Sequence, residues 1–116
     1  MLPKKQRIKK GDFAELIRSG RSFYSPNLTL RAMKDNREVK TKSLMAVVVS
    51  KKVATKAVTR NFLKRRLKYA LVKKSKELRN GFLIAFWLKK DLSKTKYADF
   101  EAEVVALLKQ ANLLNA

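Results

Sequence analysis

Residues 51–79 read KKVATKAVTRNFLKRRLKYALVKKSKELR, and they contain twelve Lys or Arg residues against one acid, Glu77. No Gly or Pro interrupts the stretch, which predicts a helix from about Thr55 to Arg79. At about 100° per residue, one arc of this helix is apolar and must face a core. That arc carries Leu63, Leu67, Ala70, Leu71 and Leu78, and the neighbouring arc carries Arg60, Asn61, Lys64, Arg65 and Lys68.

The charge of the second arc favours a polyanionic partner. Like charges three and four residues apart repel each other, and no acids are interleaved to relieve the repulsion. A solvated face, the simplest alternative, normally mixes both signs. The chain of 116 residues carries a net charge of +20, which leaves nucleic acid and anionic membrane as candidates. Nucleic acid is predicted over membrane. A helix that lies on a membrane buries its apolar face in the lipid, whereas the Leu arc of this helix is needed for a core.

Length and composition predict one nucleic-acid-binding domain, residues 1–116, in which residues 1–10 form a basic flexible arm. The chain has no Cys, and therefore no disulfide framework or thiolate metal site. Its longest apolar run, Phe82 to Leu88, is far shorter than the ~20 residues that span a bilayer. We therefore expect a cytoplasmic protein with no membrane partner.

The remaining pattern predicts an α+β fold, an α/β sandwich with the order αβββαβα and a four-stranded sheet. Asp12 is expected to cap the first helix and Gly20 to end it. Continuous apolar residues predict that Leu44–Val49 is a central strand, and Asn80-Gly81 is expected to stop the basic helix. The expected helices are Phe13–Ser19, Thr55–Arg79 and Tyr97–Gln110, the strands are Arg21–Tyr24, Leu28–Met33, Leu44–Val49 and Phe82–Leu88, and Asp35–Ser43 is a loop.

No catalytic constellation can be assembled from these residues. The chain has no His, and its three scattered Gly residues form no phosphate-binding loop. Asp99 and Glu103 have the i,i+4 spacing that can hold a metal ion through water, but an exposed acidic first turn is the commoner explanation. We therefore predict neither catalytic nor metal-binding residues in the protein.

Two stretches carry motifs of a known protein family. Val49-Ser50-Lys51-Lys52, followed after a short spacer by Arg60-Asn61-Phe62-Leu63-Lys64-Arg65, resembles the RNR signature region of the protein subunit of bacterial ribonuclease P. Ile8-Lys9-Lys10-Gly11-Asp12-Phe13, with Ile17 and Gly20, is similar to its amino-terminal helix. The chain departs from the family at Phe62, which is usually Arg or Lys, at Arg66, which is usually apolar, and at Ala46, which is often Gly.

The resemblance implies a noncatalytic subunit of an endoribonuclease that removes the 5′ leader from precursor tRNA. Catalysis would belong to the RNA, with magnesium ions bound mainly by that RNA and none by the protein alone. Its partners would be ribonuclease P RNA and precursor tRNA, with no obligate protein partner. The family fold also implies a left-handed βαβ crossover, although such crossovers are generally right-handed.

The resemblance also implies a role for individual residues. The positions implied to bind the RNA subunit are Lys51, Lys52, Lys56, Arg60, Asn61, Lys64, Arg65 and Lys68. A cleft between the first helix and the sheet would bind the leader through Phe13, Ile17 and Arg31. A ribosomal or chaperone-like RNA-binding protein with no role in cleavage is the main alternative, followed by a DNA-binding protein and an independent nuclease.

Phe62 and Tyr69 are further candidates for RNA contact. Together with Arg66 and Lys73 they form a stripe roughly opposite the Leu arc. Aromatic side chains alternating with cations favour base stacking. Alternatively, the loop before the helix or the segment around Leu113 and Leu114 covers both rings.

Overall fold

The computed structural model describes residues 7–34 and 43–114. Residues 1–6 of the predicted arm and residues 35–42 of the predicted loop Asp35–Ser43 lie outside this part. The element order αβββαβα is confirmed, with a short 3₁₀ helix, η2, after the second α-helix. The elements are α1 (Lys10–Ser19), β1 (Arg21–Tyr24), β2 (Leu28–Lys34), β3 (Leu44–Val48), α2 (Ala57–Lys73), η2 (Ser75–Glu77), β4 (Phe82–Leu88) and α3 (Tyr97–Gln110). None of the described helices is long and apolar enough to cross a membrane.

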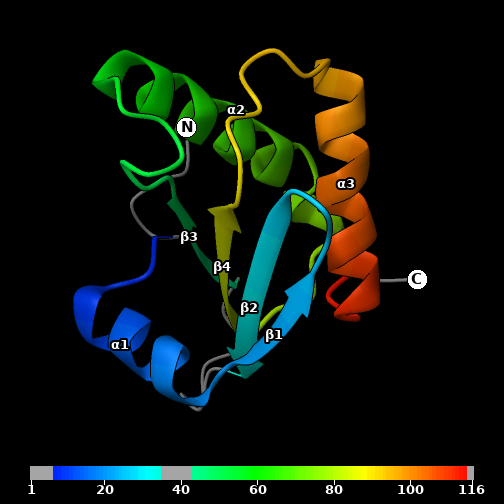
Figure 1. The fold of residues 1–116 in the computed structure, drawn as a ribbon. Coiled ribbons are helices and arrows are strands. Elements are labelled where there is room, and N and C mark those ends of the chain that lie inside the picture. Colours follow the sequence, from blue (N-terminus) through cyan, green and yellow to red (C-terminus); the bar gives the residue numbers. More distant parts are fainter. Residues whose placement is uncertain (1–6, 35–42, 115–116) are drawn as a thin grey trace.

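The four strands form one mixed sheet in the order β1-β2-β4-β3. The β1–β2 and β2–β4 pairs are antiparallel, whereas β3 and β4 are parallel and are joined through α2. Helices α2 and α3 lie on one face of the sheet, and α1 lies on the other face, near the end of the sheet where β1 begins (Figure 1). Each face has its own core: a large one beneath α2 and α3, and a small one beneath α1, formed by Leu16, Leu83 and Ala85.

The central strands are β2 and β4, and the prediction that β3 is central was wrong. Strand β3 lies at the edge of the four-stranded sheet, beside β4. Its run of apolar residues has another cause, because Met45 and Val47 contact the large core while Leu44 and Ala46 contact the small one. A strand that meets a core on each face is apolar throughout, whatever its position in the sheet.

The basic helix is shorter than predicted, because α2 ends at Lys73. The chain then passes through η2 to Leu78, whose backbone is extended and pairs with Leu114. Leu78 is 6% exposed, so it does reach the core, but from an extended segment and not from the helical arc. Gly81 has a φ of 83°, a left-handed conformation that suits Gly, and forms the turn into β4.

Gly20 ends α1, but not in the left-handed conformation typical of a Gly after a helix. Its φ is −74°, and its N–H donates to the Leu16 carbonyl. A Cβ atom at this position would lie 2.6 Å from that carbonyl oxygen and 3.0 Å from Cγ of Arg31. The close approach of helix and sheet therefore requires Gly here. At the other end of α1, Lys9 occupies the N-cap position, and the predicted cap Asp12 lies within the first turn.

Both ends of the described chain are attached to the fold. Arg7 forms a parallel bridge with Met45, and Ile8 packs on the small core, so the part of the predicted arm next to α1 lies along β3. At the other end, Leu113 is 1% exposed, and its carbonyl accepts a hydrogen bond of 2.7 Å from the Arg79 N–H. The segment after α3 thus closes one end of the large core.

Candidate nucleic-acid interface

The exposed side of α2 carries a hollow of about 460 Å³ lined by Val58, Asn61, Lys64, Arg65 and Lys68. We call Asn61, Lys64, Arg65 and Lys68 the basic α2 surface. Leu63 and Leu67 on the neighbouring arc of the helix are fully buried, and they fix the direction in which the cations point. Within residues 7–34 and 43–114, Lys64, Arg65 and Lys68 form no ion pair with an acid. Four of the eight predicted RNA-subunit contacts therefore lie together.

The other four predicted contacts lie before this surface or at its edge. Lys51, Lys52 and Lys56 are exposed in the segment between β3 and α2. Arg60 is half-buried, and its Nη1 donates to the carbonyls of Ala54 and Thr55 at 3.0 and 2.8 Å. Arg60 therefore holds the segment that enters α2, in addition to any contact with RNA.

The predicted stripe on α2 faces helix α3. The Arg66 guanidinium lies over the rings of Phe62, Tyr97 and Phe100, at 5.2, 5.9 and 5.7 Å from their centroids. It also donates a 3.0 Å hydrogen bond to the Leu92 carbonyl. Phe62 and Tyr69 nevertheless remain 37% and 58% exposed. The element beside them is the start of α3, not the loop or the C-terminal segment that the alternative named.

Phe13 and Ile17 lie on α1 above the smaller core. The Phe13 ring is half-buried and packs on Trp87 of β4, with ring centroids 5.8 Å apart. Ile17 is 46% exposed, a high fraction for an apolar side chain beside a core. The sequence did not single out Trp87, since every residue of the Phe82–Leu88 run is apolar and the run alone does not show which side chains face α1.

Arg31 is the third predicted leader contact, and its guanidinium is engaged within the protein. Nε and Nη2 donate to the carbonyls of Leu16 and Ile17 at 2.8 and 2.6 Å, and Nη1 donates to Ser22 Oγ at 2.6 Å. Arg31 thus binds the last turn of α1 to the sheet, where a cation also complements the helix dipole. Its contact with RNA remains a prediction.

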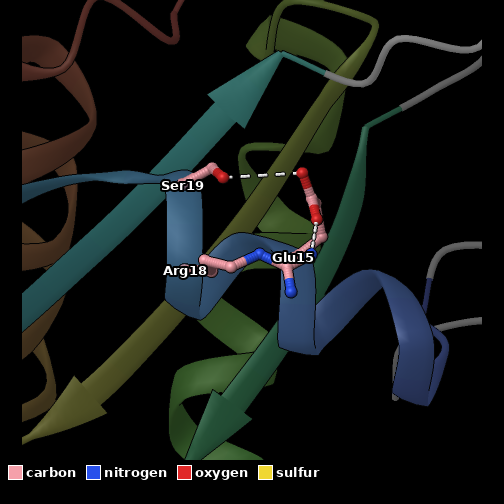
Figure 2. A network of polar contacts seen from close by, with 3 residues as sticks. All are labelled: Glu15, Arg18 and Ser19. Carbon is pink, nitrogen blue, oxygen red and sulfur yellow. Dashed lines mark hydrogen bonds and ion pairs between the residues drawn. The ribbon is translucent and has the colours of Figure 1, made fainter.

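The exposed side of α1 carries a small polar network of Glu15, Arg18 and Ser19 (Figure 2). The Glu15 carboxylate accepts hydrogen bonds from the Arg18 guanidinium and from Ser19 Oγ. Both Glu15 and Arg18 are substantially exposed, so the pair contributes little to stability. Its effect is to neutralise the one cation in the last turn of α1.

The acids of α3 serve the fold. Glu103 accepts hydrogen bonds from Ser25 Oγ, from the Asn27 N–H at 2.8 Å and from Asn27 Nδ2 at 2.9 Å. Burial alone would raise the pKa of Glu103, but these bonds and nearby Lys89 together hold it below its ordinary value. The part of the chain that the structure describes contains no group of three or more His, Cys, Asp or Glu residues that could hold a metal ion.

Comparisons with known proteins agree with the resemblance in the sequence. The profile of the family described as Ribonuclease P matches residues 2–112. This chain belongs to that family. The ribonuclease P protein component of Synechococcus elongatus is 36% identical over 98% of this chain and 96% of its own length. The corresponding protein of Clostridium novyi is 30% identical over 98% of this chain and 100% of its own length.

Solved structures of the family share the fold. The ribonuclease P protein of Staphylococcus aureus matches with a TM-score of 0.81 and 22% identity, over 95% of this chain and 98% of its own. The Thermotoga maritima protein matches with a TM-score of 0.78 and 24% identity, over 90% and 96%. These matches include the β3–α2–β4 unit, for which the family implies a left-handed crossover.

Membership in the ribonuclease P family establishes several of the predictions. The chain is a subunit of the ribonuclease P ribonucleoprotein, an endoribonuclease, and it is an RNA-binding protein of tRNA processing. Ribonuclease P RNA is the partner that this membership implies.

Proposed function

We propose that this subunit uses two surfaces on opposite faces of its sheet, one for each RNA. The basic α2 surface binds the RNA subunit, together with Lys51, Lys52, Lys56 and Arg60. The surface around Phe13 and Ile17 binds the 5′ leader of precursor tRNA, and Arg31 supports it from the sheet. The single observation that carries this proposal is the separation of α1 from α2 by the sheet, with a core on each side.

The two surfaces differ in chemistry in a way that suits their proposed ligands. The basic α2 surface offers three cations and an amide without a competing acid, which suits the phosphates of a folded RNA. The α1 side offers an aromatic pair and an exposed Ile, which suit the unstacked bases of a single strand. In this arrangement the protein adds affinity for leader-bearing substrate, while the RNA performs the cleavage.

Binding of the RNA subunit is tested with a double substitution, Arg65→Gln with Lys68→Gln. If about six phosphates are neutralised, the affinity of the unmodified protein falls with a log–log salt slope of about −4 to −5. The double variant should bind more weakly, with a slope shallower by about two. It should also raise the magnesium concentration that the RNA needs to cleave precursor tRNA.

The matched control removes the same charge elsewhere, with Lys76→Gln and Lys109→Gln, both exposed. This control should retain most of the affinity. Equal losses in the two variants would show that net charge, and not the α2 surface, determines binding, and would overturn the proposed interface. Arg60 is left unchanged, because it supports the backbone before α2.

Leader binding is tested with Phe13→Ala in the reconstituted holoenzyme. The preference for precursor over mature tRNA should fall by about 1–3 kcal/mol, the usual contribution of one base stacked on an aromatic ring. Phe13→Leu keeps apolar bulk against Trp87 but removes the ring, so it should show the same loss in a well-folded protein. Equal losses of affinity for precursor and mature tRNA would assign Phe13 a role in folding alone.

Magnesium is assigned to the RNA in this proposal. The residues that line the basic α2 surface include no carboxylate, which is the side-chain ligand that Mg²⁺ prefers in proteins. The basic α2 surface instead contributes positive charge, which lowers the ionic requirement of the assembled particle.

A further inference from the structure

The sheet face that carries α1 has a row of side chains at the end away from Arg31. Strand pairing places Tyr24 opposite Thr29, Thr29 opposite Trp87, and Trp87 opposite Val48. Paired residues of adjacent strands project from the same face of a sheet. We call Tyr24, Thr29, Trp87 and Val48 the outer row, and it crosses all four strands.

The outer row connects the predicted leader surface, which it meets at Trp87, to the exposed aromatic ring of Tyr24. Trp87 contacts Phe13 of α1, whereas Tyr24, two strands away on the sheet edge, is 62% exposed. At about 4.8 Å per strand, the two side chains start about 10 Å apart, with the short side chain of Thr29 between them. Among the described residues no aromatic ring packs on Tyr24, so its exposed face is open to a ligand.

A cation is held beside this ring. Lys89 Nζ lies 5.2 Å from the centroid of Tyr24 and donates a 2.8 Å hydrogen bond to the Ser25 carbonyl. The Lys89 N–H donates to the Asn27 carbonyl at 2.9 Å, which joins the end of β4 to the β1–β2 turn. Asn27 in that turn donates hydrogen bonds to Glu103 of α3, so the positions of the Tyr24 ring and the Lys89 ammonium group are fixed by the fold.

An aromatic ring with an adjacent ammonium group is suited to one nucleotide, since the base stacks on the ring and the phosphate pairs with the cation. Four-stranded sheets that bind single-stranded RNA use aromatic side chains on adjacent strands in this way, stacking two or three bases. The exposed Lys90 adds positive charge directly after Lys89.

We propose that Tyr24 and Lys89 form a second binding site for an unpaired RNA nucleotide. An RNA strand bound at the Phe13–Trp87 pair would reach this site along the outer row. The inference rests on the proposed binding of the leader at Phe13, and it extends that site by one stacked base and one phosphate contact. The ligand class is single-stranded RNA, continuous with the segment bound beside α1.

The test is a series of precursor tRNAs with leaders of increasing length, bound to the reconstituted holoenzyme. Affinity for the unmodified protein should rise in two steps, the second when the leader becomes long enough to reach Tyr24. Tyr24→Ala and Tyr24→Leu should lose only the second step, about tenfold in affinity, whereas Tyr24→Phe should keep it. Lys89→Gln should weaken the second step and make its salt slope shallower by about 0.7.

Two controls distinguish a failure of the second binding site from a failure of the proposed leader binding at Phe13. Lys109→Gln removes an exposed cation from α3, so it is the matched control for Lys89→Gln and should leave both steps unchanged. Because the chain has one Trp, at position 87, its fluorescence reports whether the first site is filled in every variant. An unchanged second step in both Tyr24→Ala and Tyr24→Leu would overturn the second binding site but would not affect the proposed binding of the leader at Phe13. Absence of any dependence on leader length in the unmodified protein overturns both.

Discussion

Arg66 accounts for two departures from the family pattern at the scale of single residues. The resemblance described above implies a cation at position 62 and an apolar residue at position 66, and this chain has Phe62 and Arg66 instead. The reversal places the guanidinium over three rings between α2 and α3 and gives it the Leu92 carbonyl as acceptor. The contacts are therefore internal, and the charge at Arg66 supports helix packing.

The same arrangement leaves part of Phe62 and Tyr69 open to RNA. We predict that Phe62→Ala and Tyr69→Ala each weaken binding of the RNA subunit while leaving its salt slope unchanged, because stacking releases no counterions. Affinity is measured across a range of salt concentrations for each variant. Thermal melting of the free proteins identifies any loss due to unfolding, and unchanged affinity in two folded variants would contradict a stacking role.

Tyr97 carries a buried hydroxyl group without a hydrogen-bond partner among the described residues. Burial, with the nearby Glu101 carboxylate, raises the pKa of Tyr97 to about 12. We predict that Tyr97→Phe increases the free energy of unfolding at neutral pH by about 1 kcal/mol, because an unpaired buried polar group is costly. Urea denaturation measures this change, with Tyr24→Phe at an exposed ring on β1 as the control.

The pH dependence provides a second test of Tyr97. Its raised pKa means that the folded state retains a proton that the unfolded state loses above about pH 10. Stability should therefore fall between about pH 10 and pH 12 in the unmodified protein, and fall less in Tyr97→Phe. Identical alkaline profiles for the two proteins would contradict the burial of this hydroxyl.

At the scale of elements, one carboxylate on α3 fastens the β1–β2 turn to the helical layer. We predict that Glu103→Gln lowers the free energy of unfolding by about 1–3 kcal/mol at pH 7, since it weakens charge-assisted hydrogen bonds from Ser25 and Asn27. The lowered pKa of Glu103 means that this stability is present above about pH 4.5 and is lost as the pH falls through the folded-state value.

The difference between the two proteins should therefore shrink in acid. Urea denaturation at pH 7 and at pH 3 measures it, with Glu15→Gln on the exposed side of α1 as the matched control. That control should change stability by less than about 1 kcal/mol, as expected for an exposed pair. A constant difference at both pH values would show that Glu103 acts through packing and not through its charge.

The sequence predicted most of the elements because local signals decide them. The bounds of β1 and β4 were predicted to the residue, and α3 was predicted to end at about Gln110, since Gly, Pro or charged residues flank short apolar or periodic runs. Local pattern failed where a distant segment decides the structure. The helical signal continued past Lys73, but pairing of Leu78 with Leu114 draws that segment into an extended conformation.

The candidate sites show the same division. Helical periodicity brought together Asn61, Lys64, Arg65 and Lys68 correctly, because they lie on one side of one helix. Periodicity could not place Phe62 and Arg66 against α3 or turn the Arg31 guanidinium toward α1, since these contacts join distant parts of the chain. Trp87 and Tyr24 required the register of the sheet, which sequence alone did not provide.

At the scale of the whole molecule, the net charge of +20 acts against the compact state. We predict that sulfate or phosphate raises the melting temperature of the free protein more than chloride does at equal ionic strength. Multivalent anions both screen the cations and occupy surfaces such as the basic α2 surface. Differential scanning fluorimetry of the unmodified protein and of the Arg65→Gln, Lys68→Gln variant measures the effect.

The variant should gain less from sulfate or phosphate than the unmodified protein, since two of the cations that attract the anion are gone. An equal gain in both proteins would assign the stabilisation to general screening and would remove the specific contribution of the basic α2 surface.

The segment after α3 makes the fold sensitive to how far translation has proceeded. A stop codon in place of Leu113 would remove a side chain that is 1% exposed, together with the carbonyl that receives the Arg79 N–H and the Leu114 partner of Leu78. All four strands and three α-helices would already have been synthesised, yet the large core would lack its closing residues. A chain that stopped at Asn112 would thus expose apolar surface to chaperones and proteases, and only a chain that includes Leu114 would close this end of the large core.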